Sequence, residues 1–248
     1  KEYRRQRQMC IRDRFSFQRF IIPELCNYHG KAIYLDADMQ VFQDIGDLWS
    51  YPMNGCDLQT VAESKSSRRG QFSVMLLDCA KLAWNVDDII KSLDKGLLNY
   101  KQLMHEMHLA RQIGRNIAPT WNSLEHYHAG RTALVHYTDM NIQPWVDCTN
   151  PLASLWVAGL RRAMLKGFVS REEIQAEVEN GHVRPSLLEQ LDSGIDDPKM
   201  LSKAQRSLDH RFVAPYHSLS SDRLNPWKSY VAALKFRLAQ TVYRFKCI

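Results

Sequence analysis

The stretch Lys31-Ala-Ile-Tyr-Leu-Asp-Ala-Asp-Met-Gln-Val41 guides the interpretation of the whole chain. Its residues 32–35 form a short apolar run rich in strand formers and follow Gly30, which predicts a buried strand. Asp36 and Asp38 come directly after this run. Because alternate residues of an extended chain point the same way, both carboxylates can face one point at the strand end. In α/β folds this is where ligands bind.

Two carboxylates facing one point repel each other unless a cation neutralises them. Oxygen ligands of this kind suit Mg²⁺ or Mn²⁺, which can in turn bind phosphate oxygens. An isolated Asp-x-Asp is a weak motif, so the hypothesis depends on its position after an apolar strand and on the surrounding sequence. We therefore predict that Asp36 and Asp38 bind Mn²⁺ or Mg²⁺.

The surrounding sequence resembles the family 8 glycosyltransferases, which include glycogenin-like and bacterial galactosyltransferase-like enzymes. The resemblance is carried by residues 15–25, by Tyr34-Leu-Asp-Ala-Asp-Met39 and by Phe42-Gln-Asp-Ile-Gly-Asp-Leu-Trp49, and it continues less strictly to Trp145. It implies a GT-A-like α/β fold with a mixed sheet flanked by helices. It also implies a metal ion held by the Asp-x-Asp, transfer with retention, and a nucleotide-sugar donor such as a UDP-sugar.

Residues further along the chain match positions that complete the metal and diphosphate sites of this family. The family places a metal-binding His at a strand end, and His136 matches it in the apolar run 132–137. A lone His on a strand is more often structural, but the upstream Asp-x-Asp and the downstream Pro-Trp favour a ligand. The family continues with Lys-Pro-Trp, whose Lys holds the diphosphate. Here Gln143 replaces the Lys and precedes Pro144 and Trp145, so the resemblance implies Gln143 and Trp145 as substrate-binding residues.

Three more residues match catalytic and sugar-binding positions, with departures from the family pattern. Gln71 stands where the family has an Asn that contacts the sugar, and Asn122 matches an Asn near the acceptor side. The family places an Asp-Gln pair beside the sugar. Here Lys101 replaces the Asp and Gln102 remains as the candidate catalytic residue. Because no carboxylate is an obvious nucleophile, front-face attack by the acceptor, assisted by the leaving phosphate, is the simpler mechanism.

Composition places the chain among globular proteins. It has 248 residues, of which 45% are hydrophobic and 24% charged. No apolar run approaches the roughly 18 residues that span a bilayer, and no secretory signal is recognisable. The six cysteines form no Cys-x-x-Cys pair, so we expect reduced thiols and a cytoplasmic protein.

The positive charge is concentrated towards the C-terminal end. The net charge is +6, yet residues 199–248 contain ten Lys or Arg and only Asp209 and Asp222 as acids. Residues 227–245 predict a basic amphipathic helix, which could lie on the anionic inner face of a membrane or dock with a solvated basic face. The sequence lacks the interleaved aromatic and basic residues of a nucleic-acid groove, so we expect no nucleic-acid partner.

Four segments are expected. Residues 1–14 contain five arginines, and Met9-Cys-Ile-Arg-Asp-Arg14 resembles the translation of a transposase adapter. We therefore expect a disordered or artefactual segment there, with a basic arm as the alternative. Residues 15–150 are the expected GT-A-like catalytic domain, from which the family's first nucleotide-binding strands are missing. Residues 151–191 should form a helical extension, and residues 192–248 a basic helical tail.

Hydrophobic periodicity and end signals place the elements along the chain. Ser170 and Glu173 have the spacing of a capping box. Helices are expected at 15–25, 43–51, 79–93, 100–113, 152–167, 170–181 and 227–245, strands at 32–35, 56–62, 72–78 and 132–137, and a linker at 192–198.

The sequence thus predicts a metal-dependent, retaining glycosyltransferase that uses a nucleotide-sugar donor and an acceptor that is a glycan, a lipid or a protein. Because the Asp-Gln pair and the Lys are altered, a non-catalytic sugar-nucleotide-binding protein of the same fold is an alternative. A basic module that binds a membrane surface is another.

Overall fold

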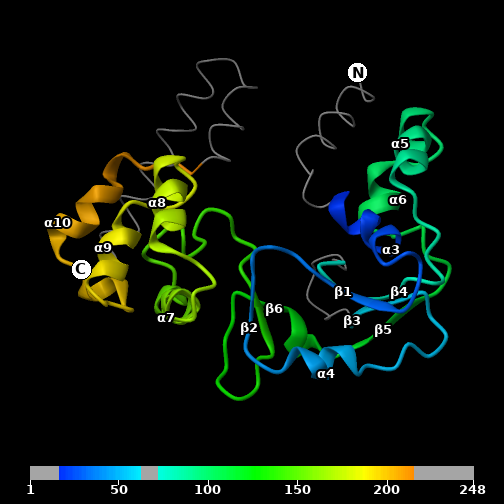
Figure 1. Cartoon of the computed structure of the whole chain (residues 1–248), viewed down its shortest axis with the longest axis horizontal. Helices are drawn as coiled ribbons and strands as arrows, with labels where there is room; N and C mark the ends of the chain where they lie inside the picture. The colour runs from blue at the N-terminus through cyan, green and yellow to red at the C-terminus, as the bar shows by residue number, and fades with distance from the viewer. Residues whose placement is uncertain (1–16, 63–71, 215–248) are drawn as a thin grey trace. The chain divides into compact units, whose positions relative to one another are not determined.

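The computed structural model of the chain describes residues 17–62 and 72–214 (Figure 1). The chain divides into two compact units, Lys1–Thr138 and Asp139–Ile248. The described part of the first unit contains two β-sheets with helices, and that of the second contains helices. The predicted segment 1–14, Gln71 and the predicted helix 227–245 lie outside the described residues.

A four-stranded sheet forms the centre of the first unit, with the strand order β1-β4-β3-β5. Strands β1 and β3 pair antiparallel with β4, and β5 pairs parallel with β3. The parallel pair packs closely at Gly114, where a Cβ would lie 2.1 Å from Oε1 of the buried Gln59. Only glycine leaves room for that side chain. The strands are β1 (Lys31–Leu35), β3 (Leu58–Val61), β4 (Val74–Asp78) and β5 (Ile113–Ile117).

Strand β4 is buried on both faces of this sheet, because helices cover each face (Figure 1). Its side chains alternate, so Met75 and Leu77 enter one core and Val74 and Leu76 the other. The first core also takes residues from the helices α3, α5 and α6, and the second takes Leu48 from α4. The helices of this unit are η1 (Gln18–Ile21), α3 (Ile22–Leu25), α4 (Ile45–Trp49), α5 (Val86–Asp94), α6 (Tyr100–Met104) and η2 (Pro119–Asn122).

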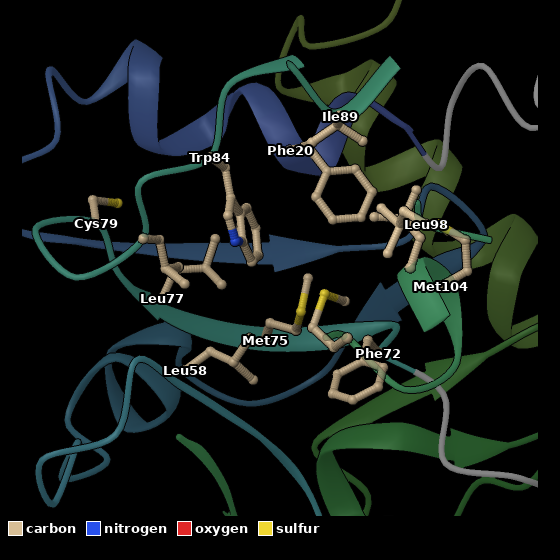
Figure 2. Packing of buried hydrophobic residues seen from close by; sticks show 13 residues of the cluster. Phe20, Leu58, Phe72, Met75, Leu77, Cys79, Trp84, Ile89, Leu98 and Met104 are labelled. Carbon is tan, nitrogen blue, oxygen red and sulfur yellow. The ribbon is translucent and has the colours of Figure 1, made fainter. Parts of the chain in front are cut away.

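Aromatic rings fill the first core. Figure 2 shows Phe20 and Trp84 beside each other above Met75. The two ring centroids are 5.1 Å apart in an edge-to-face arrangement, and the indole Nε1 donates to the Leu109 carbonyl at 3.1 Å. The buried indole therefore has a hydrogen-bond partner, as buried polar groups generally require.

A second, three-stranded sheet lies at the end of strand β1. Its order is β2-β7-β6, with β2 (Met39–Val41) antiparallel to β7 (Leu134–His136) and β6 (Ser123–Leu124) parallel to β7. The chain passes from β1 to β2 through the turn that contains Asp36 and Asp38. This turn therefore joins the two sheets.

In its described part, the second unit is a small helical cluster. Its core is formed by Val157, Ile174, Leu187 and Leu191. Ser170 caps α8 through the predicted capping box with Glu173, and Gly181 follows the helix end with a φ of +74°. The helices are α7 (Ala153–Leu165), α8 (Arg171–Glu179), α9 (Ser186–Asp192), η3 (Pro198–Met200), α10 (Lys203–Ser207) and η4 (Leu208–Arg211).

A fully buried arginine holds this cluster together. Arg184 donates to the Pro144 carbonyl at 3.1 Å and to Gln190 Oε1 at 2.6 Å, and its guanidinium also contacts Ser186 Oγ. Ser186 Oγ in turn donates to Asp209 at 2.6 Å. Burial lowers the pKa of Arg184, and the nearby Asp209 opposes that shift. The buried charge is thus satisfied by hydrogen bonds, and the side chain anchors the segment around Pro144.

Strand predictions were more accurate than helix boundaries. The four predicted strands are present, although β1 is half-buried rather than buried because it lies at the edge of the described sheet. Two helix predictions were too long. The helix predicted at 79–93 begins only at Val86, because Asn85 caps it by accepting from the Asp88 N–H. The helix predicted at 100–113 ends at Met104, and Met107 has a φ of +51°.

Other elements were not predicted. Strands β2, β5 and β6 were missed, while α9 and α10 were not predicted as separate helices although they lie largely in the expected helical extension and tail. The predicted linker 192–198 is held by side chains of the second unit, since Arg161 donates to Asp196 at 2.7 Å and Gln190 donates to the Asp196 carbonyl at 2.9 Å. Cys26, Cys56, Cys79 and Cys148 are free thiols. Within 17–62 and 72–214, no helix has the length and apolar character needed to cross a bilayer.

Candidate metal centre

The two aspartates of the Asp-x-Asp motif lie in the turn between β1 and β2. The Asp36 N–H donates to the Ser73 carbonyl at 3.1 Å, and the Asp38 carbonyl accepts from the Tyr137 N–H at 2.9 Å. Both turn residues are therefore fixed by neighbouring backbone. Their carboxylates are half-buried, so they remain accessible to solvent.

His136 ends strand β7 and brings an imidazole to the same place. In the antiparallel register, His136 is opposite Met39, the residue that follows Asp38. Its Nε2 is 3.1 Å from Asp38 Oδ1 and 4.0 Å from Asp36 Oδ2. The imidazole is 3% exposed. Potential ligand atoms of these three residues all lie within 4.8 Å of one another. In the described part of the chain, no other group of three or more His, Cys, Asp or Glu side chains is arranged to hold a metal.

Asp36 is oriented by Arg19 and Tyr34. The buried Arg19 guanidinium donates to the Phe72 carbonyl at 2.9 Å, to Tyr34 Oη at 3.0 Å and to Asp36 Oδ1 at 3.1 Å. Tyr34 Oη also donates to Asp36 Oδ1 at 2.5 Å. Burial raises the pKa of Tyr34; Arg19 opposes the shift and Asp36 adds to it. Two donors thus engage Oδ1, while Oδ2 faces His136.

Sequence analysis missed Arg19 and Tyr34, although each left a signal. Arg19 is the only charged residue between Phe15 and Pro23. Tyr34 precedes Asp36 by two positions, so on a strand the two side chains share a face. The Arg19 guanidinium also lies 4.5 Å from the Tyr34 ring centroid, which is a cation–π contact.

Asn122 lies on the other side of His136. Its Oδ1 is 2.9 Å from His136 Nδ1, the ring nitrogen that does not face the aspartates. Asn122, one of the predicted substrate-binding residues that the structure describes, therefore directly contacts a predicted metal ligand. Its predicted role towards the acceptor stays a prediction.

Gln102 lies at the start of helix α6. Its Oε1 accepts from the Asn99 N–H at 2.9 Å, and its own N–H donates to Asn99 Oδ1 at 3.0 Å, which completes a capping box. The structure thus gives Gln102 a role in capping the start of the helix. Its catalytic role stays a prediction.

The predicted substrate-binding roles of Gln143 and Trp145 stay predictions. Gln143 and Trp145 belong to the second unit. Gln143 is buried, and its carbonyl accepts from the N–H groups of Val146 and Asp147. The Trp145 ring packs against Trp156 with centroids 5.5 Å apart, and its carbonyl accepts from the Arg184 N–H at 2.8 Å.

The first part of the chain matches the sequence model of a known family. Residues 3–93 match the sequence model of the family described as Glycosyl transferase family 8. The match confirms, for that segment, the resemblance predicted from the sequence. It contains Asp36 and Asp38, while His136 lies beyond it. No curated protein matches the chain.

Solved structures that resemble the chain include two glycosyltransferases. The galactosyltransferase LgtC, in complex with donor and acceptor sugar analogues, is 16% identical with a TM-score of 0.43, over 58% of this chain and 65% of LgtC. GlyE from Streptococcus pneumoniae TIGR4 is 18% identical with a TM-score of 0.41, over 51% of this chain and 38% of GlyE. The chain therefore covers less than two thirds of the length of either protein.

Proposed function

We propose that this chain, whose residues 3–93 match glycosyl transferase family 8, is a metal-dependent glycosyltransferase. The observation that carries the proposal is the convergence of Asp36, Asp38 and His136 at the junction of the two sheets. The reaction is transfer of a sugar from a nucleotide-sugar donor, such as a UDP-sugar, to an acceptor hydroxyl with retention.

The donor atoms of the cluster fit a divalent cation. Two carboxylates and one imidazole match the ligand preferences of Mn²⁺, and the carboxylates also suit Mg²⁺. Asp36, Asp38 and His136 would supply three protein ligands, and a bound ion could also take oxygens of the donor. A bound ion would neutralise the departing nucleoside diphosphate.

The charges around the cluster support a diphosphate ligand. Asp36 and Asp38 are negative, and Arg19 adds one positive charge beside Asp36. Their sum is −1, and a divalent ion changes it to +1. The loaded site therefore attracts an anionic diphosphate, while the empty site repels it.

The protein's own groups hold and orient the reactants in this proposal. Arg19 and Tyr34 fix Asp36 through Oδ1, so its other oxygen stays directed towards His136. Gln143 and Trp145 are proposed to contact the donor. The acceptor hydroxyl attacks the anomeric carbon on the face of the leaving group, the bond from that carbon to the diphosphate breaks to release the nucleoside diphosphate, and an oxygen of that diphosphate takes the hydroxyl proton.

The test is a calorimetric titration of Mn²⁺ into wild type and into Asp38→Asn. Asp38→Asn keeps the side-chain size but removes a charged ligand, so we expect at least about tenfold weaker binding, or 1.4 kcal/mol. Asp47→Asn is the matched control, since Asp47 is an exposed residue of α4 outside the cluster. Equal affinity for wild type and Asp38→Asn would disprove the metal site.

Turnover of UDP-sugars with Mn²⁺ then separates an enzyme from a binding protein. Release of UDP that depends on Mn²⁺ and is lost in Asp38→Asn is the expected result. Mn²⁺ and UDP binding without any turnover would favour the non-catalytic alternative, which the replacement of the family's Lys by Gln143 supports.

A further inference from the structure

We propose that Asn122 is a positioning residue for the metal site, because its side-chain oxygen holds His136 in the tautomer whose Nε2 is free to bind the ion. This inference rests on the proposed function. It assigns to Asn122 a role different from the acceptor contact that the family resemblance implies.

The hydrogen bond between the two side chains determines which ring nitrogen carries the proton. Asn122 Oδ1 lies 2.9 Å from His136 Nδ1, and an amide oxygen can only accept. Nδ1 must therefore be the donor, which leaves the lone pair of the neutral ring on Nε2. That nitrogen is the one 3.1 Å from Asp38 Oδ1.

The other tautomer would work against metal binding. With its proton on Nε2, His136 would donate to Asp38 and occupy both the imidazole and one carboxylate oxygen. With its proton on Nδ1, Nε2 and the oxygens of Asp38 and Asp36 form a set of acceptors that a cation stabilises. Hydrogen bonds to the far nitrogen commonly fix metal-bound histidines in this way.

Regular backbone pairing places Asn122 beside His136. Asn122 ends the turn η2 and leads directly into strand β6, where Leu124 pairs with His136 in the parallel register. The Glu125 N–H also donates to the His136 carbonyl at 3.1 Å. Trp121, which precedes Asn122, is 3% exposed and belongs to the second core of the first unit. The amide is thus held by a packed turn and a strand, which suits a residue that must orient another.

The rival role for Asn122 predicts different behaviour. A residue that only contacts the acceptor would change the KM for the acceptor and leave metal affinity alone. A positioning residue changes metal affinity in the absence of both substrates. The decisive experiment therefore measures Mn²⁺ binding without donor or acceptor.

The binding experiment uses electron paramagnetic resonance to follow free Mn²⁺ in titrations of four full-length proteins. Asn122→Leu has a similar volume but no acceptor, and we expect affinity to fall by about 10–100-fold, the usual effect of removing an outer-shell partner. Asn122→Asp keeps an acceptor and should restore affinity to at least that of wild type. Asn116→Leu is the control, because it removes another amide of the same unit, one that donates to Gln59. Its affinity should not change.

The protonation of His136 is measured independently by ¹⁵N NMR of the metal-free protein at pH 8, with His136→Gln to assign the signal among the nine histidines. We expect a proton on Nδ1 in wild type and in Asn122→Asp. A proton on Nε2 alone in wild type would overturn the inference, and so would unchanged Mn²⁺ affinity in a folded Asn122→Leu.

The two proposals fail in distinguishable ways. If wild type binds no Mn²⁺, the metal site of the proposed function is wrong, and the inference about Asn122 as a positioning residue falls with it. If wild type binds Mn²⁺ and loses it in Asp38→Asn but not in Asn122→Leu, the metal site stands and only the role of Asn122 is wrong. If Asn122→Leu does not fold, the Mn²⁺ affinity of Asn122→Asp and the wild-type NMR signal still test whether Asn122 positions His136.

Discussion

The candidate metal site contains two kinds of side chain: those that can bind an ion, such as Asp36 and His136, and those that orient these ligands, such as Arg19. Arg19 is buried and donates hydrogen bonds to the Phe72 carbonyl, Tyr34 and Asp36. A buried guanidinium is tolerated only when it is paired and hydrogen-bonded, so its position is strongly determined. Because it engages Asp36 Oδ1, it also fixes the direction of Oδ2. The site is therefore organised before any ligand arrives.

Substitution of Gln102 separates its observed role from its predicted one. Gln102→Glu keeps the capping box with Asn99, since Glu serves equally well at that position of a helix. We expect an unchanged melting temperature and little change in turnover, because the side-chain oxygen is already engaged by the helix end. A fall in kcat of more than about tenfold in a folded variant, equal to 1.4 kcal/mol in the barrier, would instead assign Gln102 to the reaction.

The ligands of the candidate site could be predicted from the sequence, whereas the residues that orient them could not. Asp36 and Asp38 follow an apolar run, so strand-end position marked them, whereas His136 was marked by the resemblance to the family. Arg19 contacts Asp36 across 17 positions of sequence, through a side chain that extends from a helical turn. Such contacts depend on tertiary packing, which periodicity does not report.

At the scale of elements, strands were easier to predict than helix ends. β4 is buried on both faces, so its sequence is a nearly continuous apolar run. β5 (Ile113–Ile117) contains Gly114, Arg115 and Asn116, which obscure any strand pattern. Only its first residue, Ile113, fell within a predicted helix, and residues 114–117 were assigned to no element. Its strand conformation comes from parallel pairing with β3, a tertiary effect that overrides local propensity.

Two capping boxes of the second unit allow a matched prediction about helix stability. Ser170→Ala removes the acceptor for the Glu173 N–H at the start of α8, and we expect a loss of about 1 kcal/mol in the free energy of unfolding. Ser202→Ala removes the equivalent bond of α10, a five-residue helix with no buried residue, and should have a smaller effect.

Chemical denaturation followed by far-ultraviolet circular dichroism measures both variants. The difference arises because α8 carries Ile174 into the core of the second unit, so its loss disturbs packing as well as the helix end. Equal losses for the two variants would show that the caps, rather than the buried face, dominate the stability of these helices.

At the scale of the whole molecule, all three candidate ligands belong to the first unit, Lys1–Thr138. An ion that binds only the folded state stabilises it by about 2.7 kcal/mol at a concentration of 100 times its Kd. We expect Mn²⁺ to increase hydrogen-exchange protection in β1, β2 and β7 and to leave α7, α8 and α9 nearly unchanged. Mass spectrometry of the exchanged full-length chain resolves these segments.

Asp38→Asn serves as the control, because its exchange should not respond to Mn²⁺. Protection that rises equally in the helices of the second unit would contradict the prediction. It would mean that the two units unfold as one cooperative body, in which case ion binding to the first would stabilise both.

The position of His136, nearly a hundred residues after Asp38, also has a consequence for biosynthesis. Ribosomes add about 5–20 residues per second, so His136 is synthesised on the order of 5–20 s after Asp38. During that interval β2 has no β7 with which to pair. The proposed metal site therefore cannot form in its final geometry until His136 has been made, and ion binding there would come only after nearly all of the first unit has been synthesised.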